Sequence, residues 1–173
     1  MPRATRSSGD IDEGRNKVDS GVKLWRLTRA PFVALDGAGA VMHGARYAPL
    51  GEPVVSLASE AALAVLITLR YLPRDLEGIA DDYVLGWTEA DAVPERVPCG
   101  SDDAIRDWTG QWLAEGRSLL AAVASKVLPE ADVVLLNPRH SGAAAVPPLT
   151  TRPFSFAECL HRPPMLDSYR RTS

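Results

Sequence analysis

The apolar run AALAVLITL, at residues 61–69, is the feature that most constrains the fold of this 173-residue chain. Its Ala and Leu content favours helix, Ser59 is suited to cap that helix, and Glu60 complements the positive end of the helix dipole. Because proline cannot continue a helix, Pro73 ends it, and the pattern predicts a helix that continues to Leu72. The run is too short to cross a bilayer, so no transmembrane helix is expected.

Segments rich in strand-forming residues lie before and after this helix. Glycines in residues 37–44 predict a loop, and the prolines and glycine of residues 94–100 predict a surface excursion. Residues 118–128 are ambiguous, because their Leu and Ala favour helix locally. The remaining patterns predict strands at 23–28, 53–58, 83–87 and 132–136, a turn at Asn137-Pro138, and an amphipathic helix at 102–116 whose Ile105, Trp108 and Trp112 face the core.

Length and composition indicate one soluble domain with a tail at each end. Apolar residues make up 46% of the chain and charged residues 24%, as is ordinary for a folded domain. Residues 1–22 are polar and are predicted to be a disordered tail, and residues 161–173 a second tail, which leaves 23–160 as the domain. The net charge of -3 provides no broad basic face for a phosphate backbone, so nucleic acid is not an expected partner.

The two cysteines and the N-terminus bear on compartment and on metal binding. Cys99 and Cys159 are far apart, and the chain has neither a CxxC motif nor a His pair at ligand spacing. We therefore expect no disulfide scaffold and no metal site. The polar N-terminus lacks a secretion signal, and a cytoplasmic location is predicted.

Several short stretches follow one another in a characteristic order, and together they resemble the RES family, the toxin-type proteins named for an Arg, a Glu and a Ser. The resemblance covers residues 23–160 and implies a compact α+β domain of the ADP-ribosyltransferase type, with a mixed sheet and a strand that contains Ser125. The stretches are LWRLTR at 24–29, GARYAPLGEPVVSLAS at 44–59, AALAVLITL at 61–69, WLAEGRSLLAAVASKVLPEA at 112–131 and VVLLNPRHS at 133–141.

The resemblance also implies a function. The family is associated with bacterial toxin–antitoxin pairs, in which the toxin degrades NAD+ and a helical Xre-type antitoxin blocks it. By resemblance, NAD+ is the expected substrate, not a bound cofactor, and the expected enzyme is an NAD+ phosphorylase or glycohydrolase. An Xre-type antitoxin is the expected partner, and pairing with a second copy of the chain is left open.

Three residues match family site positions. Arg26 of LWRLTR and Arg46 of GARYAPLG match two family arginines, and guanidinium groups suit the pyrophosphate of NAD+ because they are planar, bidentate and always charged. Ser125 of AVASKVLP matches the family serine, which implies a catalytic role in orienting the nicotinamide amide or the ribose. The alternative is a buried serine that bonds the backbone of its own segment.

Four positions depart from the family pattern. Ser56 stands where the family has Tyr, Ile67 where it has Glu, and Ala157 and Cys159 replace an acid and a base near the end. A carboxylate could stabilise the oxocarbenium-like charge that develops on ribose as nicotinamide leaves, and Ile67 cannot. Glu60, two helical turns earlier and about 10 Å away, is interpreted mainly as a helix-dipole charge. A catalytically decayed relative that keeps ligand or antitoxin binding is therefore the alternative to an enzyme.

The histidines do not indicate a hydrolase. His43, His140 and His161 have no triad-like spacing, and the chain has no GxSxG elbow. His140 follows Asn137-Pro138 and is predicted to fix that turn by a side-chain hydrogen bond.

Overall fold

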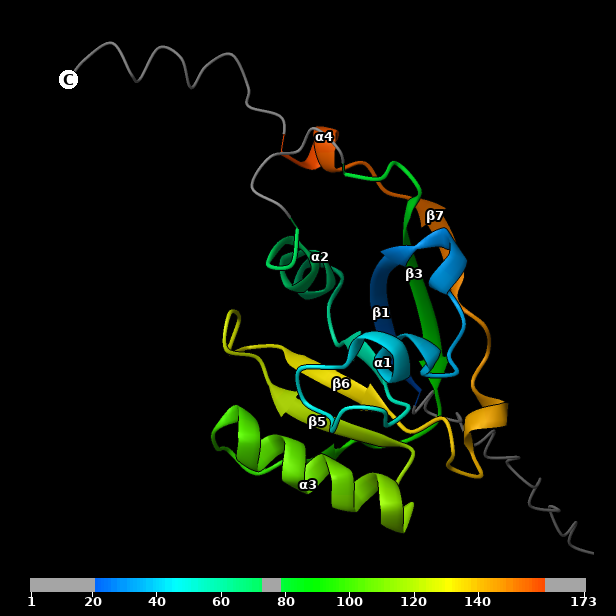
Figure 1. Cartoon of the computed structure of the whole chain (residues 1–173). Helices are drawn as coiled ribbons and strands as arrows, with labels where there is room; N and C mark the ends of the chain where they lie inside the picture. The colour runs from blue at the N-terminus through cyan, green and yellow to red at the C-terminus, as the bar shows by residue number, and fades with distance from the viewer. Residues whose placement is uncertain (1–20, 73–78, 161–173) are drawn as a thin grey trace, which may run out of the picture.

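The computed structural model describes residues 21–72 and 79–160. The predicted tails lie outside this range, except for residues 21 and 22. Pro73, which was predicted to end the helix, also lies outside it. Figure 1 shows the elements in order: β1 (Val22–Arg29), η1 (Ala30–Phe32), α1 (Ala38–His43), β2 (Val55–Ala58), α2 (Ala61–Leu69), β3 (Tyr83–Ala90), β4 (Glu95–Arg96), α3 (Asp102–Glu115), β5 (Leu120–Ala124), β6 (Asp132–Leu136), η2 (Ala143–Ala145), β7 (Thr150–Pro153) and α4 (Phe156–Cys159).

A seven-stranded mixed sheet runs through the domain in the order β4-β5-β6-β2-β1-β3-β7. β4 and β5 are parallel, and the other neighbours are antiparallel. β1 pairs with β3 along its whole length but shares with β2 only the pair Trp25 and Ala58. The sheet therefore divides into two halves, and Figure 1 shows β1 and β3 running up the picture while β5 and β6 cross it. The expected α+β class with a mixed sheet is confirmed.

Helix α2 supplies a partner at the place where β1 and β2 separate. Alternate residues of a strand direct their backbone N–H and C=O groups to the same neighbouring strand. The backbone carbonyl of Leu27 therefore points to the side on which Trp25 pairs with β2. The Thr68 hydroxyl of α2 lies 3.3 Å from the Leu27 carbonyl oxygen and 3.0 Å from that of Ala64, and it donates to both. A carbonyl without a strand partner is thus satisfied by a helix side chain.

The core occupies both faces of the half-sheet that contains β5 and β6. Trp112 of α3 is fully buried against one face, and Leu24 and Leu57 are buried with the other. Burial on both faces explains why residues 118–128 contain a strand despite their helical propensity. The strand implied by the family resemblance is confirmed, although Ser125 follows its last residue.

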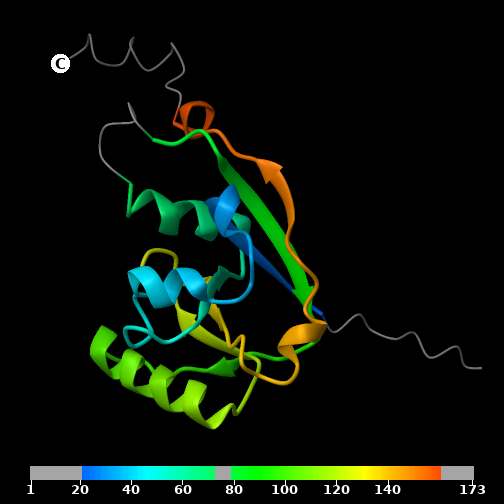
Figure 2. The ribbon, with the colours of Figure 1, turned by 45° about the vertical axis from the view of Figure 1, so that its right-hand side comes forward.

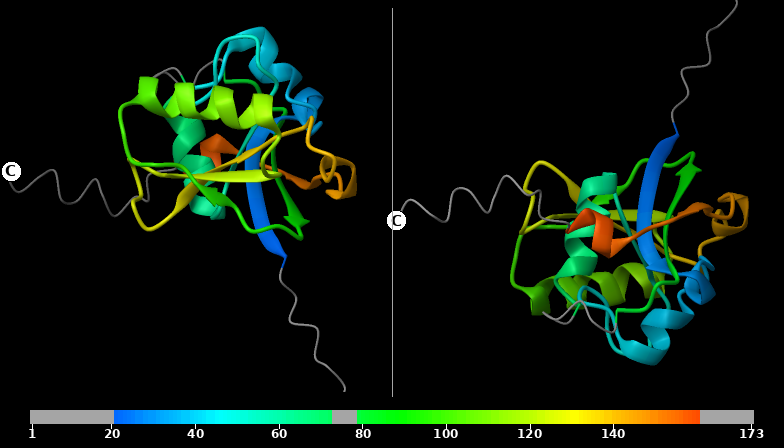
Figure 3. Two further views of the ribbon diagram at one scale, coloured as in Figure 1. Left: turned by 90° about the horizontal axis from the view of Figure 1, so that it is seen from below. Right: turned by 90° about the horizontal axis from the view of Figure 1, so that it is seen from above.

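The helices α2, α1 and α3 follow one another from top to bottom along one side of the molecule in Figure 2. Figure 3, from below, shows α3 alongside β5 and β6. The predicted helix at 102–116 is confirmed as α3, with Gly116 as its left-handed C-cap. Trp108 is only half-buried and stacks on Trp112 with ring centroids 6.3 Å apart. Among the described residues, no helix is long and apolar enough to cross a bilayer.

The predicted loop at 37–44 is wrong, because Ala38–His43 form the short helix α1. The glycines do adopt positive φ, but at the two ends of the helix, with +75° at Gly37 and +77° at Gly44. The Asp36 carboxylate accepts the Ala38 amide at 2.9 Å, which satisfies one of the first-turn donors.

The predicted cap of α2 is also wrong. The Ser59 hydroxyl accepts the amide of Asp132 at 2.9 Å, and the Ser59 amide donates to the Asp132 carbonyl at 2.9 Å, so Ser59 continues the pairing of β2 with β6. Glu60 takes the N-cap position without a side-chain cap bond. The helix ends at Leu69, three residues earlier than predicted.

Two segments predicted as irregular contain regular structure. The excursion at 94–100 includes β4, which pairs with β5. The polar, proline-rich sequence past Phe156 predicts a loose chain end, but residues 156–159 form α4, where the Ser155 hydroxyl accepts the Glu158 amide at 3.2 Å. Phe156 is buried and meets Tyr83 edge-to-face at 4.9 Å, which anchors α4 to β3.

Replacing Gly37 with alanine should destabilise the domain. An added Cβ would lie 2.7 Å from the backbone nitrogen of Val54, and a φ of +75° is unfavourable for alanine. We expect Gly37→Ala to lower the free energy of unfolding by about 1–3 kcal/mol in urea titrations. Gly39→Ala is the matched control within α1, because nothing lies within 4 Å of its added Cβ. An equal loss in both variants would contradict the packing of α1 described above.

Candidate ligand pocket

A pocket of about 810 Å³ opens between α1, the end of α2 and the turn that joins β5 to β6. Its size is in the range of small-molecule sites in proteins. It is lined by Gly39, Ala40 and His43 of α1, residues 44–47, Ile67, Arg70 and Tyr71 at the end of α2, residues 125–127, and Arg26, Val54, Ser56 and Val133.

Five of the eight positions that the sequence indicated for the chemistry line this one pocket. Arg26, Arg46 and Ser125 come from β1, the segment after α1 and the segment after β5. Ser56 and Ile67, which stand where the family has Tyr and Glu, come from β2 and α2. The structure therefore brings together residues as distant in the sequence as Arg26 and Ser125. Glu60 is outside the lining, and so are Ala157 and Cys159 of α4.

Arg26 is half-buried and partly engaged. One terminal nitrogen of its guanidinium donates to the Ala34 carbonyl oxygen at 3.0 Å. Burial lowers the pKa of Arg26, and the nearby Asp36 carboxylate opposes that shift. A guanidinium has five N–H donors, so Arg26 keeps donors for a ligand.

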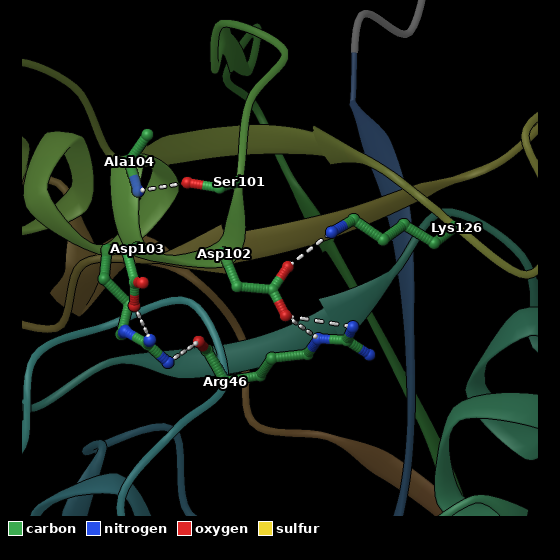
Figure 4. A network of polar contacts seen from close by, with 7 residues as sticks. Arg46, Ser101, Asp102, Asp103, Ala104 and Lys126 are labelled. Carbon is green, nitrogen blue, oxygen red and sulfur yellow. Dashed lines mark hydrogen bonds and ion pairs between the residues drawn. The ribbon is translucent and has the colours of Figure 1, made fainter.

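Arg46 and Lys126 share a single carboxylate at the first residue of α3 (Figure 4). Asp102 Oδ2 accepts from Nε of Arg46 at 3.1 Å, and Oδ1 accepts from Nζ of Lys126 at 2.6 Å. The hydroxyl of the N-cap Ser101 accepts the Ala104 amide at 3.2 Å, which fixes this end of α3. One carboxylate thus joins three elements around the pocket. The group of Arg46, Lys126 and Asp102 keeps a net positive charge.

The same contacts shift the pKa values of Arg46 and Asp102. Burial alone would lower the pKa of Arg46, but electrostatic interactions with Tyr47 and Asp102, together with the hydrogen bond to Asp102, outweigh it and raise that pKa. The hydrogen bond from Lys126, together with Arg46, lowers the pKa of Asp102 against the effect of partial desolvation.

Ser125 bonds the backbone of its own turn. Its buried hydroxyl oxygen accepts the amides of Val127 at 3.3 Å and Leu128 at 3.2 Å. Both acceptor positions of the oxygen are thereby used, whereas no acceptor for its O–H occurs among the described residues. Ser125 therefore stabilises the turn and keeps one donor.

The predicted role of His140 is confirmed. Its Nδ1 accepts the Gly142 amide at 3.0 Å, and Asn137 Oδ1 accepts the Arg139 amide at 2.9 Å. These bonds hold the turn after β6, away from the pocket.

Two further cations, Arg70 and Lys126, line the pocket and were not predicted as site residues. A signal for each was present, since Lys126 directly follows Ser125 and Arg70 lies one helical turn after Ile67. Arg70 is exposed and has no ion pair or hydrogen bond from its side chain within residues 21–72 and 79–160. No Asp or Glu occurs among the described lining residues, and no group of metal-ligating residues occurs in the described part of the chain.

Fold and pocket together define an α+β domain with a basic pocket beside the junction of two half-sheets. The sequence model of the RES domain family matches residues 23–157. The chain therefore belongs to the RES domain family.

Two named relatives and one solved structure are similar to the chain. It is 34% identical over 125 residues to the "Prs ADP-ribosylating toxin" of Sphingobium sp. (strain YBL2), which covers 65% of this chain and 77% of that protein. It is 28% identical over 130 residues to the "Toxin Res" of Photorhabdus laumondii subsp. laumondii, with 66% and 81% covered. A chain of the M. tuberculosis MbcT–MbcA toxin–antitoxin complex superposes with a TM-score of 0.56 at 17% identity, covering 88% of this chain and 90% of that one, and this likeness shows the shared fold.

The Asp102 contacts should make stability depend on pH. The pKa of Asp102 in the folded protein is below the unfolded value of about 3.9. The contribution of Asp102 to the free energy of unfolding is therefore complete above the unfolded pKa, and it is lost as the pH falls through the lower pKa of the folded protein. We expect Asp102→Asn to be less stable than wild type near neutral pH in urea titrations, with the difference closing in acid.

Asp103→Asn is the control for this prediction, because Asp103 lies in the same helical turn, is exposed and, among the residues that the structure describes, pairs only with Arg106 on its own helix. Its effect should be smaller. A difference between Asp102→Asn and wild type that stayed constant into acid would contradict the proposed origin of the effect.

Proposed function

We propose that the chain is the toxin component of a toxin–antitoxin pair, binds NAD+ in this pocket and breaks the nicotinamide–ribose bond. The observation that carries the proposal is the convergence of Arg26, Arg46 and Ser125 on one pocket. The names of the two relatives, both toxins, support the toxin role.

The residues have separate tasks in this reaction. Arg26 and Arg46 hold the pyrophosphate, because each keeps guanidinium donors and a full positive charge. The free O–H of Ser125 donates to the carboxamide or ribose oxygen of the nicotinamide half. The bond from the ribose carbon to the ring nitrogen breaks, and its electron pair leaves with nicotinamide. An oxygen of phosphate or water then bonds that carbon and loses its proton to solvent.

The reaction lacks one form of assistance. A carboxylate beside the ribose would stabilise its positive charge in the transition state, and Ile67 occupies the matching family position. Loss of such a group costs on the order of 10² to 10⁴ in rate. We therefore expect slow turnover. The same observation favours a second candidate, a relative that binds NAD+ or an antitoxin without chemistry.

Exposed apolar side chains near the pocket support a protein partner. Tyr71 and Val127 line the pocket, Met42 belongs to α1, and all three are exposed. Exposed apolar groups gathered around a pocket are typical of interaction surfaces. The solved complex similar in fold is a toxin–antitoxin complex, which agrees with this proposal.

Restoring the carboxylate should reveal the chemistry. We expect Ile67→Glu to consume NAD+ about 10² to 10⁴ times faster than the wild-type chain, measured as nicotinamide release with and without phosphate. Leu66→Glu is the matched control, because Leu66 precedes Ile67 on α2 but is exposed and outside the pocket lining. The control should leave the rate unchanged.

Arg46→Ala tests whether the pocket is responsible. In the Ile67→Glu background, it should raise the KM for NAD+ by about tenfold or more, since a charged pyrophosphate contact is lost. Activity only in Ile67→Glu would favour the second candidate. No nicotinamide release from any variant, with no NAD+ binding in titrations, would refute the proposed function.

A further inference from the structure

The charge of the pocket differs from the charge of the whole chain. Four cations line it, Arg26, Arg46, Arg70 and Lys126, and no carboxylate occurs among the described lining residues. The chain as a whole has a net charge of -3. The pocket therefore concentrates positive potential in an acidic protein, as sites for anions do.

Two of these cations lie beside the residues assigned to the nicotinamide half. Lys126 directly follows Ser125, and Arg70, the C-cap residue of α2, lies three residues after Ile67. Arg46 and Lys126 share the single carboxylate of Asp102, so one positive charge of this group is uncompensated. Arg70 has no side-chain partner within the described residues.

The nicotinamide ring of NAD+ is itself a cation. A family-type carboxylate would attract the ring, whereas Ile67 offers no charge, and Lys126 and Arg70 repel it. A dinucleotide that has a carboxylate in place of the carboxamide carries one more negative charge on the ring. That charge would lie near Lys126 and Arg70, and a glutamate at position 67 would have repelled it.

We propose that the pocket prefers the deamidated dinucleotide, nicotinic acid adenine dinucleotide, over NAD+, with Lys126 and Arg70 as the residues that determine this preference. The inference rests on the proposed function, because it assumes that the dinucleotide binds with its pyridine half near Ser125. It deepens that function by naming the substrate class.

Calorimetric titration of the full chain with each dinucleotide tests the preference. We expect a Kd about tenfold lower for the carboxylate form, because a charge pair replaces a neutral contact at a partly exposed site. The ratio of the Kd for NAD+ to the Kd for the carboxylate form should fall towards one in Lys126→Gln, and likewise in Arg70→Gln. Raising the ionic strength should reduce this ratio in the wild type.

Two further variants make the test specific. Arg139→Gln is the matched control, because Arg139 is an exposed cation that pairs with Glu52 and lies outside the pocket lining, and the ratio should not change. Ile67→Glu should reverse the preference in favour of NAD+. Thermal unfolding shows that each variant is folded, and if Lys126→Gln is not folded, Arg70→Gln decides alone.

The outcomes separate this inference from the proposed function. Equal affinity for the two dinucleotides would overturn the inference and leave NAD+ binding intact. A preference for the carboxylate form that survives both Lys126→Gln and Arg70→Gln would do the same. Binding of neither dinucleotide would overturn both.

Discussion

The separation of β1 from β2 after a single register pair is the constraint on which the rest of the structure depends. Continued pairing beyond Trp25 and Ala58 would place Leu27 opposite Ser56 and close the space between the strands. Instead, the Leu27 carbonyl accepts a hydrogen bond from Thr68 of α2. Arg26 comes directly after Trp25 on β1, Ser56 lies two residues before Ala58 on β2, and both line the pocket. The split in the sheet therefore creates the pocket and supplies part of its lining.

The second organising interaction is the carboxylate of Asp102, which two cations share. It joins the start of α3, the segment after α1 and the turn after β5 at 2.6 to 3.1 Å. A partly exposed pair of this kind contributes little stability by itself, but it fixes where Arg46 and Lys126 lie. Because one carboxylate serves two cations, the pocket remains positive. The same pocket has Ile67 where the family has glutamate, so it can hold an anionic ligand more readily than it can stabilise a cationic transition state.

The elements predicted well are those determined by local signals. The strand at 132–136 ends at an Asn-Pro turn, and α3 shows its helical period in Ile105 and Trp112. The elements predicted wrongly depend on distant partners: Ser59 bonds Asp132, and Gly37 packs on residues 53–54. The family resemblance found five lining positions because matching positions occupy the same place in a shared fold. It missed Arg70 and Lys126, because such matching considers only the positions that the family pattern names.

In the proposed complex, Arg26 and Arg46 bind the pyrophosphate of a dinucleotide in this pocket, and the pyridine ring lies near Ser125 and Ile67. A crystal structure of the chain grown with NAD+ would show where each half of the dinucleotide binds. We expect pyrophosphate oxygens within hydrogen-bonding distance of both guanidinium groups and a pyridine ring between α2 and the turn after β5. A dinucleotide bound at another surface, or bound here with its pyrophosphate away from both arginines, would show that the pocket does not bind the dinucleotide in this way.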